Sequence, residues 1–176
     1  DIQELVRGGG AEPATLDPQK VEGTPGSHRT RELFEGLYNL DGDGNLIPGV
    51  AKSYTTNADN TVYTFNLRDN AKWSNGEPVT AHDFVFGFQR AVDPATASAY
   101  AWYVEIPSIA NASKIINGKA DVGSLGVKAI DDFTFEVTLE RPVPYFVKMT
   151  SHQTLFPAPR KTIEKFGSEW VKPGNM

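Results

Sequence analysis

The sequence predicts a mixed α/β fold of the α+β kind, with a mainly antiparallel sheet and flanking helices. Two stretches, 61–68 ("TVYTFNLR") and 133–140 ("FTFEVTLE"), alternate apolar and polar side chains. This period of two is typical of strands with one packed face and one solvated face. The segments between the two stretches carry apolar residues at helical spacing. With 39% hydrophobic residues, the 176-residue chain is able to bury a core of its own.

The alternation assigns one face of each predicted strand to the core. A further strand is expected over 51–57, paired with 61–68 through a turn at 57–60 ("NADN"). Another short strand is expected over 2–8 ("IQELVRG"). The core-facing residues of the two clearest strands are Tyr63, Phe65 and Leu67, and then Phe133, Phe135, Val137 and Leu139.

The best-defined predicted helix covers 81–92 ("AHDFVFGFQRAV"). Thr80 precedes it and Asp83 follows three residues later, which approximates a capping box. Such a cap typically contributes about 1 kcal/mol. Its apolar stripe consists of Phe84, Val85, Phe88 and Val92.

Four further helices are expected. One follows Ser27 as N-cap and has Leu33, Phe34, Leu37 and Tyr38 at helical spacing. Another runs through 109–118 and ends at Gly118. Two more, over 141–151 and 160–167, each begin near a proline.

Two glycine-rich stretches lack the surroundings that a ligand loop needs. Gly8–Gly10 is followed by two prolines, so no helix N-terminus directly faces it to hold a phosphate. "DGDGN" (41–45) resembles the start of a calcium loop, but Leu46 and Lys52 replace the glycine and glutamate that such loops require. The second stretch is therefore predicted to be a turn.

Composition excludes several classes of function. The net charge is −5 and no Lys/Arg run is present, which argues against nucleic-acid binding. There is no cysteine, so disulfides, thiolate zinc sites and cysteine nucleophiles are excluded. His28, His82 and His152 are too far apart to form a local metal motif. No apolar run approaches the roughly 18 residues that a membrane helix needs.

The stretch "AKWSNGEPVTAHDF" (71–84) contains several potentially reactive side chains, but a structural role explains it better than a catalytic one. Trp73 ends a strand and is expected to pack, and His82 lies in the first turn of a predicted helix, where it is expected on the surface. No second base or nucleophile accompanies them at useful spacing. We therefore expect no enzyme activity.

Six segments, taken together, resemble the N-terminal part of the bacterial periplasmic oligopeptide-binding proteins, the solute receptors of ABC peptide importers in the peptide/nickel-binding family. The most specific is "YTFNLRDNAKWSNGEPVTAHDF" within 63–98, and the resemblance covers nearly the whole chain. The segments, in order, are 15–23, 31–37, 48–54, 63–98, 125–146 and 163–175.

The resemblance implies a periplasmic-binding-protein type II-like architecture. Members of the family are considerably longer than this chain and have two lobes that close on the ligand, plus an extra domain. Residues 1–34 would be the first part of lobe I, 35–158 the extra domain, and 159–176 the start of the return into lobe I. Lobe II would be absent from this stretch of sequence.

The resemblance also implies candidate ligand-binding residues. Val21, Glu22, Gly23 and Thr24 match the lobe I strand that pairs with the ligand backbone, with Pro25 ending that strand. Tyr100 matches an aromatic residue near the edge of the pocket. Two plainer interpretations stay open. The segment between Pro18 and Pro25 would be an ordinary loop, and Tyr100 would simply pack with Trp102.

The family further implies the partners. These are an oligopeptide ligand and the membrane permease of an ABC importer, with no cofactor, no metal, no nucleic acid and no membrane insertion. We expect a periplasmic monomer from which a signal peptide has been removed. The alternatives are a receptor for murein tripeptide, dipeptide, antimicrobial peptide or haem, and, from another class, a hydrolase or surface adhesion module. The isolated chain is not expected to bind peptide as tightly as a whole receptor.

Overall fold

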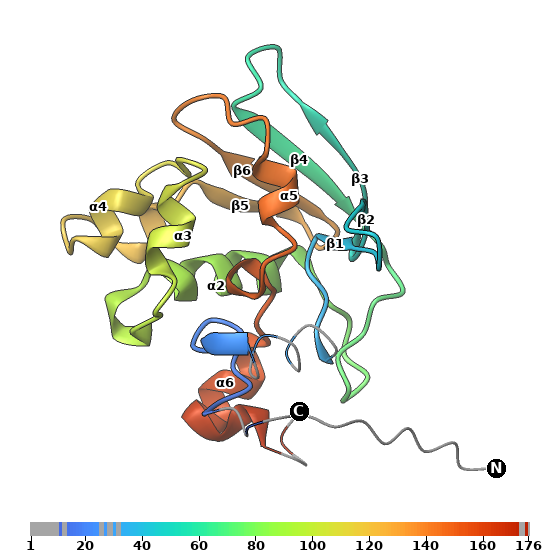
Figure 1. Cartoon of the computed structure of the whole chain (residues 1–176), viewed down its shortest axis with the longest axis vertical. Coiled ribbons are helices and arrows are strands. Elements are labelled where there is room, and N and C mark those ends of the chain that lie inside the picture. The colour runs from blue at the N-terminus through green and yellow to red at the C-terminus, as the bar shows by residue number, and fades with distance from the viewer. Residues whose placement is uncertain are drawn as a thin grey trace.

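The computed structural model describes residues 11, 14–24, 27, 30, 33–172 and 175. A four-stranded antiparallel sheet forms its centre, with helices gathered on one side of it (Figure 1). The predicted strand over 2–8 and the glycines at 8–10 lie outside the described residues. The α+β class expected from the sequence is confirmed.

The sheet has the strand order β3-β4-β6-β5, and every neighbouring pair is antiparallel. Phe65 of one central strand faces Phe135 of the other. The predicted core face is confirmed within both strands, since alternate residues are buried and those between them are half-buried. Phe133, which was also expected to face the core, lies just before β6 and is only half-buried. The strand bounds are β3 Ala51–Thr56, β4 Val62–Leu67, β5 Val127–Asp131 and β6 Thr134–Thr138.

Helix α2 (Ala81–Val92) covers the buried face of the sheet. Phe84 and Phe88 bring their rings within 5.7 and 5.2 Å of the Phe135 ring. From the same side, Phe146 of the short helix α5 (Phe146–Met149) lies 5.0 Å from the ring of Tyr63. These aromatic contacts fix α2 against the sheet.

The start of α2 confirms the predicted capped helix start in "AKWSNGEPVTAHDF", but Trp73 does not end a strand, because β4 already ends at Leu67. The backbone N–H of Thr80 donates to the Asp83 carboxylate at 3.0 Å, and the Trp73 indole N–H donates to the same oxygen at 3.0 Å. Burial raises the pKa of the Asp83 carboxyl in spite of these two donors. His82 lies on the surface, 3.4 Å from Asp132.

The helix expected after Ser27 is placed differently in the structure. Among the described residues, those at 23, 24, 27, 30 and 33 are helical, whereas residues 34–37 are not. Leu33 is 55% exposed, so it does not belong to a buried helical stripe. The backbone carbonyls of Gly36 and Leu37 pair with residues 49–51 instead of with a following helical turn. A Cβ at position 36 would lie 2.4 Å from the Thr150 carbonyl oxygen, which accounts for the glycine.

The chain after Leu37 forms a small hairpin instead of a helix. Its strands are β1 (Tyr38–Leu40) and β2 (Leu46–Pro48), and the predicted turn at 41–45 joins them. The Asp41 carboxylate accepts the N–H groups of Asp43 and Asn45, which fixes this turn.

The remaining helices are short. The helix predicted over 109–118 is present as α4 (Ala112–Ile116), and the one over 160–167 as α6 (Arg160–Phe166). The one expected over 141–151 shrinks to the single turn of α5, because Pro142 and Pro144 cannot continue a helix. Helix α3 (Ala101–Glu105) was not predicted. The 3₁₀ turns are Pro94–Thr96, Val122–Ser124, Gln153–Leu155 and Gly167–Val171.

A second, smaller apolar cluster joins the beginning and the end of the chain. Phe34, Phe156 and Trp170 form its buried centre, with the Phe34 and Trp170 rings 5.9 Å apart. In Figure 1 the earliest described residues, in blue, lie beside α6 and the red C-terminal turn. The division at 34/35 and 158/159 into lobe I and an extra domain stays a prediction.

Candidate functional site

The four predicted ligand-contacting residues at 21–24 present one buried anchor and three exposed positions. Val21 is 1% exposed, whereas Glu22, Gly23 and Thr24 are exposed. The expected strand is not formed, because Gly23 and Thr24 are already helical. Gly23 has φ +76°, a left-handed conformation that glycine adopts without steric cost and that interrupts an extended strand. Contact between this segment and a ligand stays a prediction.

A tight turn just upstream holds Val21 in place. The carbonyl oxygen of Asp17 accepts the N–H groups of Lys20 at 3.0 Å and of Val21 at 2.8 Å. The side chain of Asp17 also accepts the Gln19 N–H at 3.1 Å. Asp17 therefore organises the segment that leads into the exposed residues 22–24.

The Asp17 carboxylate is the centre of a buried polar network. Arg90, in the last turn of α2, donates from both terminal nitrogens to the two carboxylate oxygens, at 2.9 and 2.7 Å. The Trp170 indole N–H donates to the same carboxylate at 3.1 Å. Gln19 completes the network, accepting from Arg90 at 2.6 Å and donating to the Phe156 carbonyl at 3.0 Å.

The network stabilises the charged form of Asp17. Burial alone would raise the pKa of this carboxyl, but the hydrogen bonds from Arg90, its positive charge and the Trp170 donor hold the pKa below its ordinary value. Asp17 and Arg90 are separated by 73 residues, so no local sequence pattern signals their pairing. Sequence reasoning missed this network entirely.

Tyr100, the remaining predicted contact, lies at the start of α3 and is half-buried. Its ring is 6.0 Å from the ring of Trp102, which is 54% exposed, and 5.2 Å from the ring of His152. Tyr100 thus has aromatic neighbours, and these contacts do not decide between packing and a ligand role. A role of Tyr100 toward a ligand stays a prediction.

The neighbours of Tyr100 connect it with the early segment. His152 stacks on Tyr103 at 4.2 Å, and the next residue, Gln153, donates its side-chain N–H to the Ser27 hydroxyl at 3.0 Å. Ser27 lies three residues after Thr24 in the sequence. The structure thus links the two predicted parts of the site through residues 152 and 153, although they are more than seventy residues apart in the chain.

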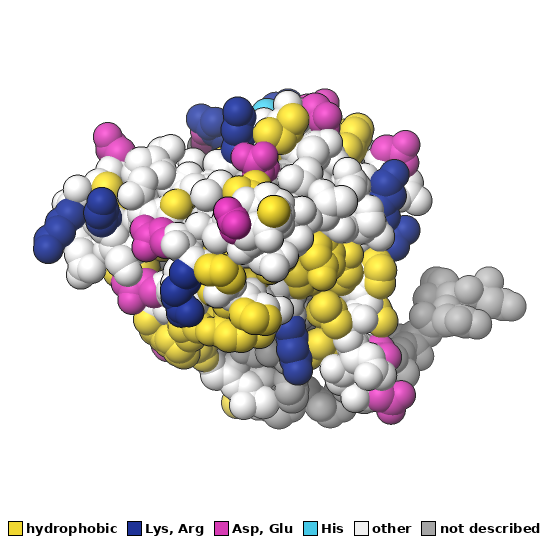
Figure 2. Space-filling view, turned by 90° about the horizontal axis from the view of Figure 1, so that it is seen from above, with side chains coloured by type: hydrophobic (Ala, Val, Ile, Leu, Met, Phe, Trp, Pro, Cys, Tyr) yellow, Lys and Arg dark blue, Asp and Glu magenta, His cyan; other side chains and the backbone are white. Residues whose placement is uncertain are grey.

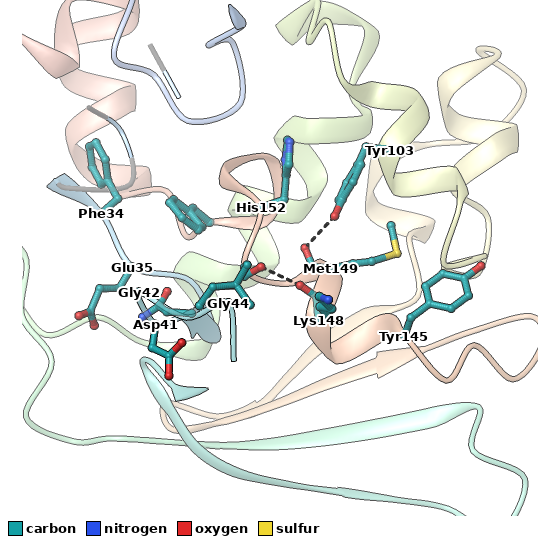
Figure 3. A pocket seen from close by; sticks show the side chains of 14 residues that line it. Phe34, Glu35, Asp41, Gly42, Gly44, Tyr103, Tyr145, Lys148, Met149 and His152 are labelled. Atoms are coloured by element: carbon teal, nitrogen blue, oxygen red, sulfur yellow. Dashed lines mark hydrogen bonds between the residues drawn. The ribbon is translucent and has the colours of Figure 1, made fainter. Parts of the chain in front are cut away.

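A cavity of about 780 Å³ opens beside this region (Figure 3). His152 and Tyr103 lie next to each other on its wall, and the Tyr103 hydroxyl donates to the Met149 carbonyl at 3.4 Å. Residues 21–24 and Tyr100 are not part of the lining. The other lining residues include Phe34, Glu35, Asp41, Tyr145, Lys148 and Phe156.

The cavity wall offers aromatic faces and a few charged side chains. Within the described part of the chain, no group of three His, Asp or Glu side chains is arranged to hold a metal ion. Figure 2 shows hydrophobic side chains gathered in one area of the face it presents, with basic side chains scattered around it. None of the described helices is long and apolar enough to cross a membrane.

Comparison with known proteins places the chain in a family. Residues 45–174 match the family described as "Bacterial extracellular solute-binding proteins, family 5 Middle". The chain belongs to this family. Among its relatives is the periplasmic oligopeptide-binding protein OppA of Escherichia coli, which is 54% identical over 174 residues, or 99% of this chain and 32% of the relative. The periplasmic murein peptide-binding protein MppA of the same organism is 49% identical over 174 residues, again 99% of this chain and 32% of the relative.

Solved structures agree with this family membership. Haemophilus influenzae OppA in complex with RPPGFSPFR has a TM-score of 0.92 and 51% identity, over 95% of this chain and 33% of that one. The unliganded open form of MppA has a TM-score of 0.90 and 48% identity, over 94% and 32%. The chain therefore spans about a third of the length of the relatives that it matches, and the type II-like fold inferred from the sequence is confirmed.

Proposed function

We propose that this chain is part of a periplasmic solute-binding receptor that captures short, extended peptides between two closing lobes for an ABC importer. The observation that carries the proposal is the similarity to the peptide-bound H. influenzae OppA, at 51% identity and a TM-score of 0.92. An oligopeptide ABC transporter substrate-binding domain from Bacillus anthracis is also similar, with a TM-score of 0.85. The proposal involves no enzyme activity and adds a membrane permease as partner.

The proposed binding mode relies on the ligand backbone. An extended peptide that pairs with receptor backbone gains affinity from main-chain hydrogen bonds that do not depend on its side chains. Water-filled pockets then accept side chains of different size and charge. The exposed residues Glu22, Gly23 and Thr24 are the part of this chain proposed to meet the peptide, with Tyr100 at the pocket edge.

A narrower ligand is the second candidate. MppA is 49% identical to this chain, and the E. coli protein YgiS, described as a probable deoxycholate-binding periplasmic protein, is 51% identical. These values are close to the 54% of the E. coli OppA. Because proteins named for different ligands match this third equally well, we place ligand choice mainly in the parts of the receptor beyond it.

The decisive experiment uses a complete receptor. The chain would replace the matching third of E. coli OppA, and the chimera would be titrated calorimetrically with trilysine, tetralysine, murein tripeptide and deoxycholate. We expect micromolar binding of the lysine peptides, which corresponds to about −8 kcal/mol. Binding of only murein tripeptide or only deoxycholate would favour a narrower receptor, and no binding by a folded chimera would reject the proposal.

The isolated chain supplies a second test. Because most of the enclosing surface belongs to the rest of the receptor, we expect no low-micromolar binding of tetralysine to the chain alone. Clear low-micromolar binding in the same calorimeter would contradict the two-lobe capture mode while leaving peptide recognition intact.

A further inference from the structure

The side chain of Arg90 contacts Asp17 and Gln19, in the turn that precedes the proposed ligand segment. We infer that Arg90 is a positioning residue, which fixes the turn at 17–21 and thereby sets where Glu22, Gly23 and Thr24 lie toward the peptide. The inference rests on the proposed function. It adds to it a residue in the predicted extra domain, outside the part of the chain that is proposed to touch ligand.

Arg90 is mounted on a rigid support. It belongs to the last turn of α2, whose other face packs through Phe84 and Phe88 onto Phe135 of the sheet. Its side chain is 11% exposed and that of Asp17 is 3% exposed, so water competes little for the contact. The planar guanidinium makes two parallel hydrogen bonds to the carboxylate, which fix orientation as well as distance.

Asp17 connects Arg90 directly to residue 21, because it contacts Arg90 through its side chain and Val21 through its backbone. Arg90 donates to the side chain of Asp17, and the backbone carbonyl oxygen of Asp17 accepts the N–H of Val21 at 2.8 Å. Gln19, in between, is held by Arg90 and by the Phe156 carbonyl. A shift of the Asp17 carboxylate therefore moves the backbone directly before the exposed residues 22–24.

Stability alone is a poor explanation for such a buried ion pair. Taking two charges out of water is costly, and well-packed apolar residues are often as stabilising as the pair they replace. What apolar packing does not supply is the directional, two-point contact of a guanidinium with a carboxylate. We therefore assign the pair a geometric role.

The test compares four variants of the chimeric receptor described above. R90M removes the two hydrogen bonds from the guanidinium and leaves the Asp17 charge buried without its partner. D17N/R90M removes both charges and so avoids that penalty. R90K keeps the positive charge but loses the planar guanidinium that makes two hydrogen bonds. R160M is the control, since Arg160 makes a comparable ion pair with Glu164, at 2.7 Å, but on the exposed surface of α6.

Three quantities would be measured for each variant. These are the tetralysine affinity, the free energy of unfolding, and the hydrogen-exchange rates of the Lys20 and Val21 amides relative to those of Tyr63 and Phe65 in the sheet. For R90M we expect at least tenfold weaker binding, lower stability and faster exchange at 20 and 21. For D17N/R90M we expect stability to recover while affinity and local exchange do not. R90K should lose less affinity than R90M, and R160M should match the wild type.

The outcomes separate the inference from the function on which it rests. If the wild-type chimera does not bind peptide, the proposed function fails and the inference fails with it. If the wild type binds and affinity recovers together with stability in D17N/R90M, the pair is only structural and the positioning role is rejected. If R90M does not fold, the comparison of R90K and D17N/R90M with the wild type decides in the same way.

Discussion

The central sheet with α2 and the early segment 15–24 are both held firmly, but by opposite means. The sheet is fixed by the burial of aromatic rings contributed by Phe65, Phe84 and Phe135, and by regular antiparallel pairing. The early segment contains little regular structure and is fixed by a few directional polar contacts around one carboxylate. Apolar burial is non-directional, whereas bidentate hydrogen bonds fix both distance and orientation. A segment that must meet a ligand at defined points benefits from the second kind of support.

Among the proposed substitutions, removing a ring from the core of the sheet should lower the free energy of unfolding most. Phe135→Ala leaves a cavity between α2 and the sheet, because Phe135 is fully buried and contacts both Phe84 and Phe88. We expect a loss of about 3–5 kcal/mol in the free energy of unfolding, measured by urea denaturation. Hydrogen exchange should speed up throughout the sheet. A loss below about 1 kcal/mol would show that the ring cluster does not carry the core.

A change at the other region should have a smaller and more local effect. Trp170→Phe removes the indole N–H that donates to Asp17 and leaves the ring packing near Phe34 partly intact. We expect a loss of about 1–3 kcal/mol, since a buried acceptor loses one donor. Exchange at Val21 should accelerate while exchange at Phe65 stays unchanged. Equal acceleration at both amides would contradict the separation of the two regions.

The smallest expected effects concern pH, and they have opposite signs in the two regions. The folded pKa of Asp17 lies below its ordinary value of 3.8, so its contribution to stability is full above 3.8 and is lost as the pH falls through the folded pKa. The folded pKa of Asp83 lies above 3.8, so its contribution is full below that value and is lost as the pH rises through the folded pKa.

Two isosteric variants test these signs. Relative to the wild type, D17N should be least stable near neutral pH and should approach wild-type stability as the pH falls. D83N should behave in the reverse way and gain on the wild type as the pH rises. Urea midpoints measured at intervals from pH 2 to pH 7 give both slopes. Slopes of the same sign in the two variants would contradict the assignment.

The sequence was sufficient for three of the four strands of the sheet because strand alternation is a local signal. The faces of β4 and β6 follow directly from it, as does the capped start of α2 at Thr80. Strand β5 was not predicted because it is short and its alternation covers only Val127, Lys128 and Ala129 before the exposed Ile130 and Asp131. The helix after Ser27 was extended too far because the pairs Leu33–Phe34 and Leu37–Tyr38 mimic helical spacing.

The candidate site was predictable only in part, for a related reason. The residues at 21–24 and Tyr100 came from the family resemblance, and their exposure and neighbours came from the structure. The contacts that hold them join distant positions, such as Asp17 with Arg90 and Ser27 with Gln153. Nothing in the turn-like sequence "LDPQ" distinguishes a buried, charged aspartate from a solvated turn residue. Such polar contacts have no periodicity, so they become visible only in three dimensions.

The span of the Asp17 network also dictates an order of assembly. The carboxylate of residue 17 is completed by a donor 73 residues later and by another 153 residues later. Because a chain emerges from the ribosome N-terminus first, residues 17–21 must wait for α2 and then for Trp170 before their contacts can close. The segment proposed to meet the ligand is thus among the first parts of the chain to be synthesised, but its supporting contacts are complete only after residue 170 has been made.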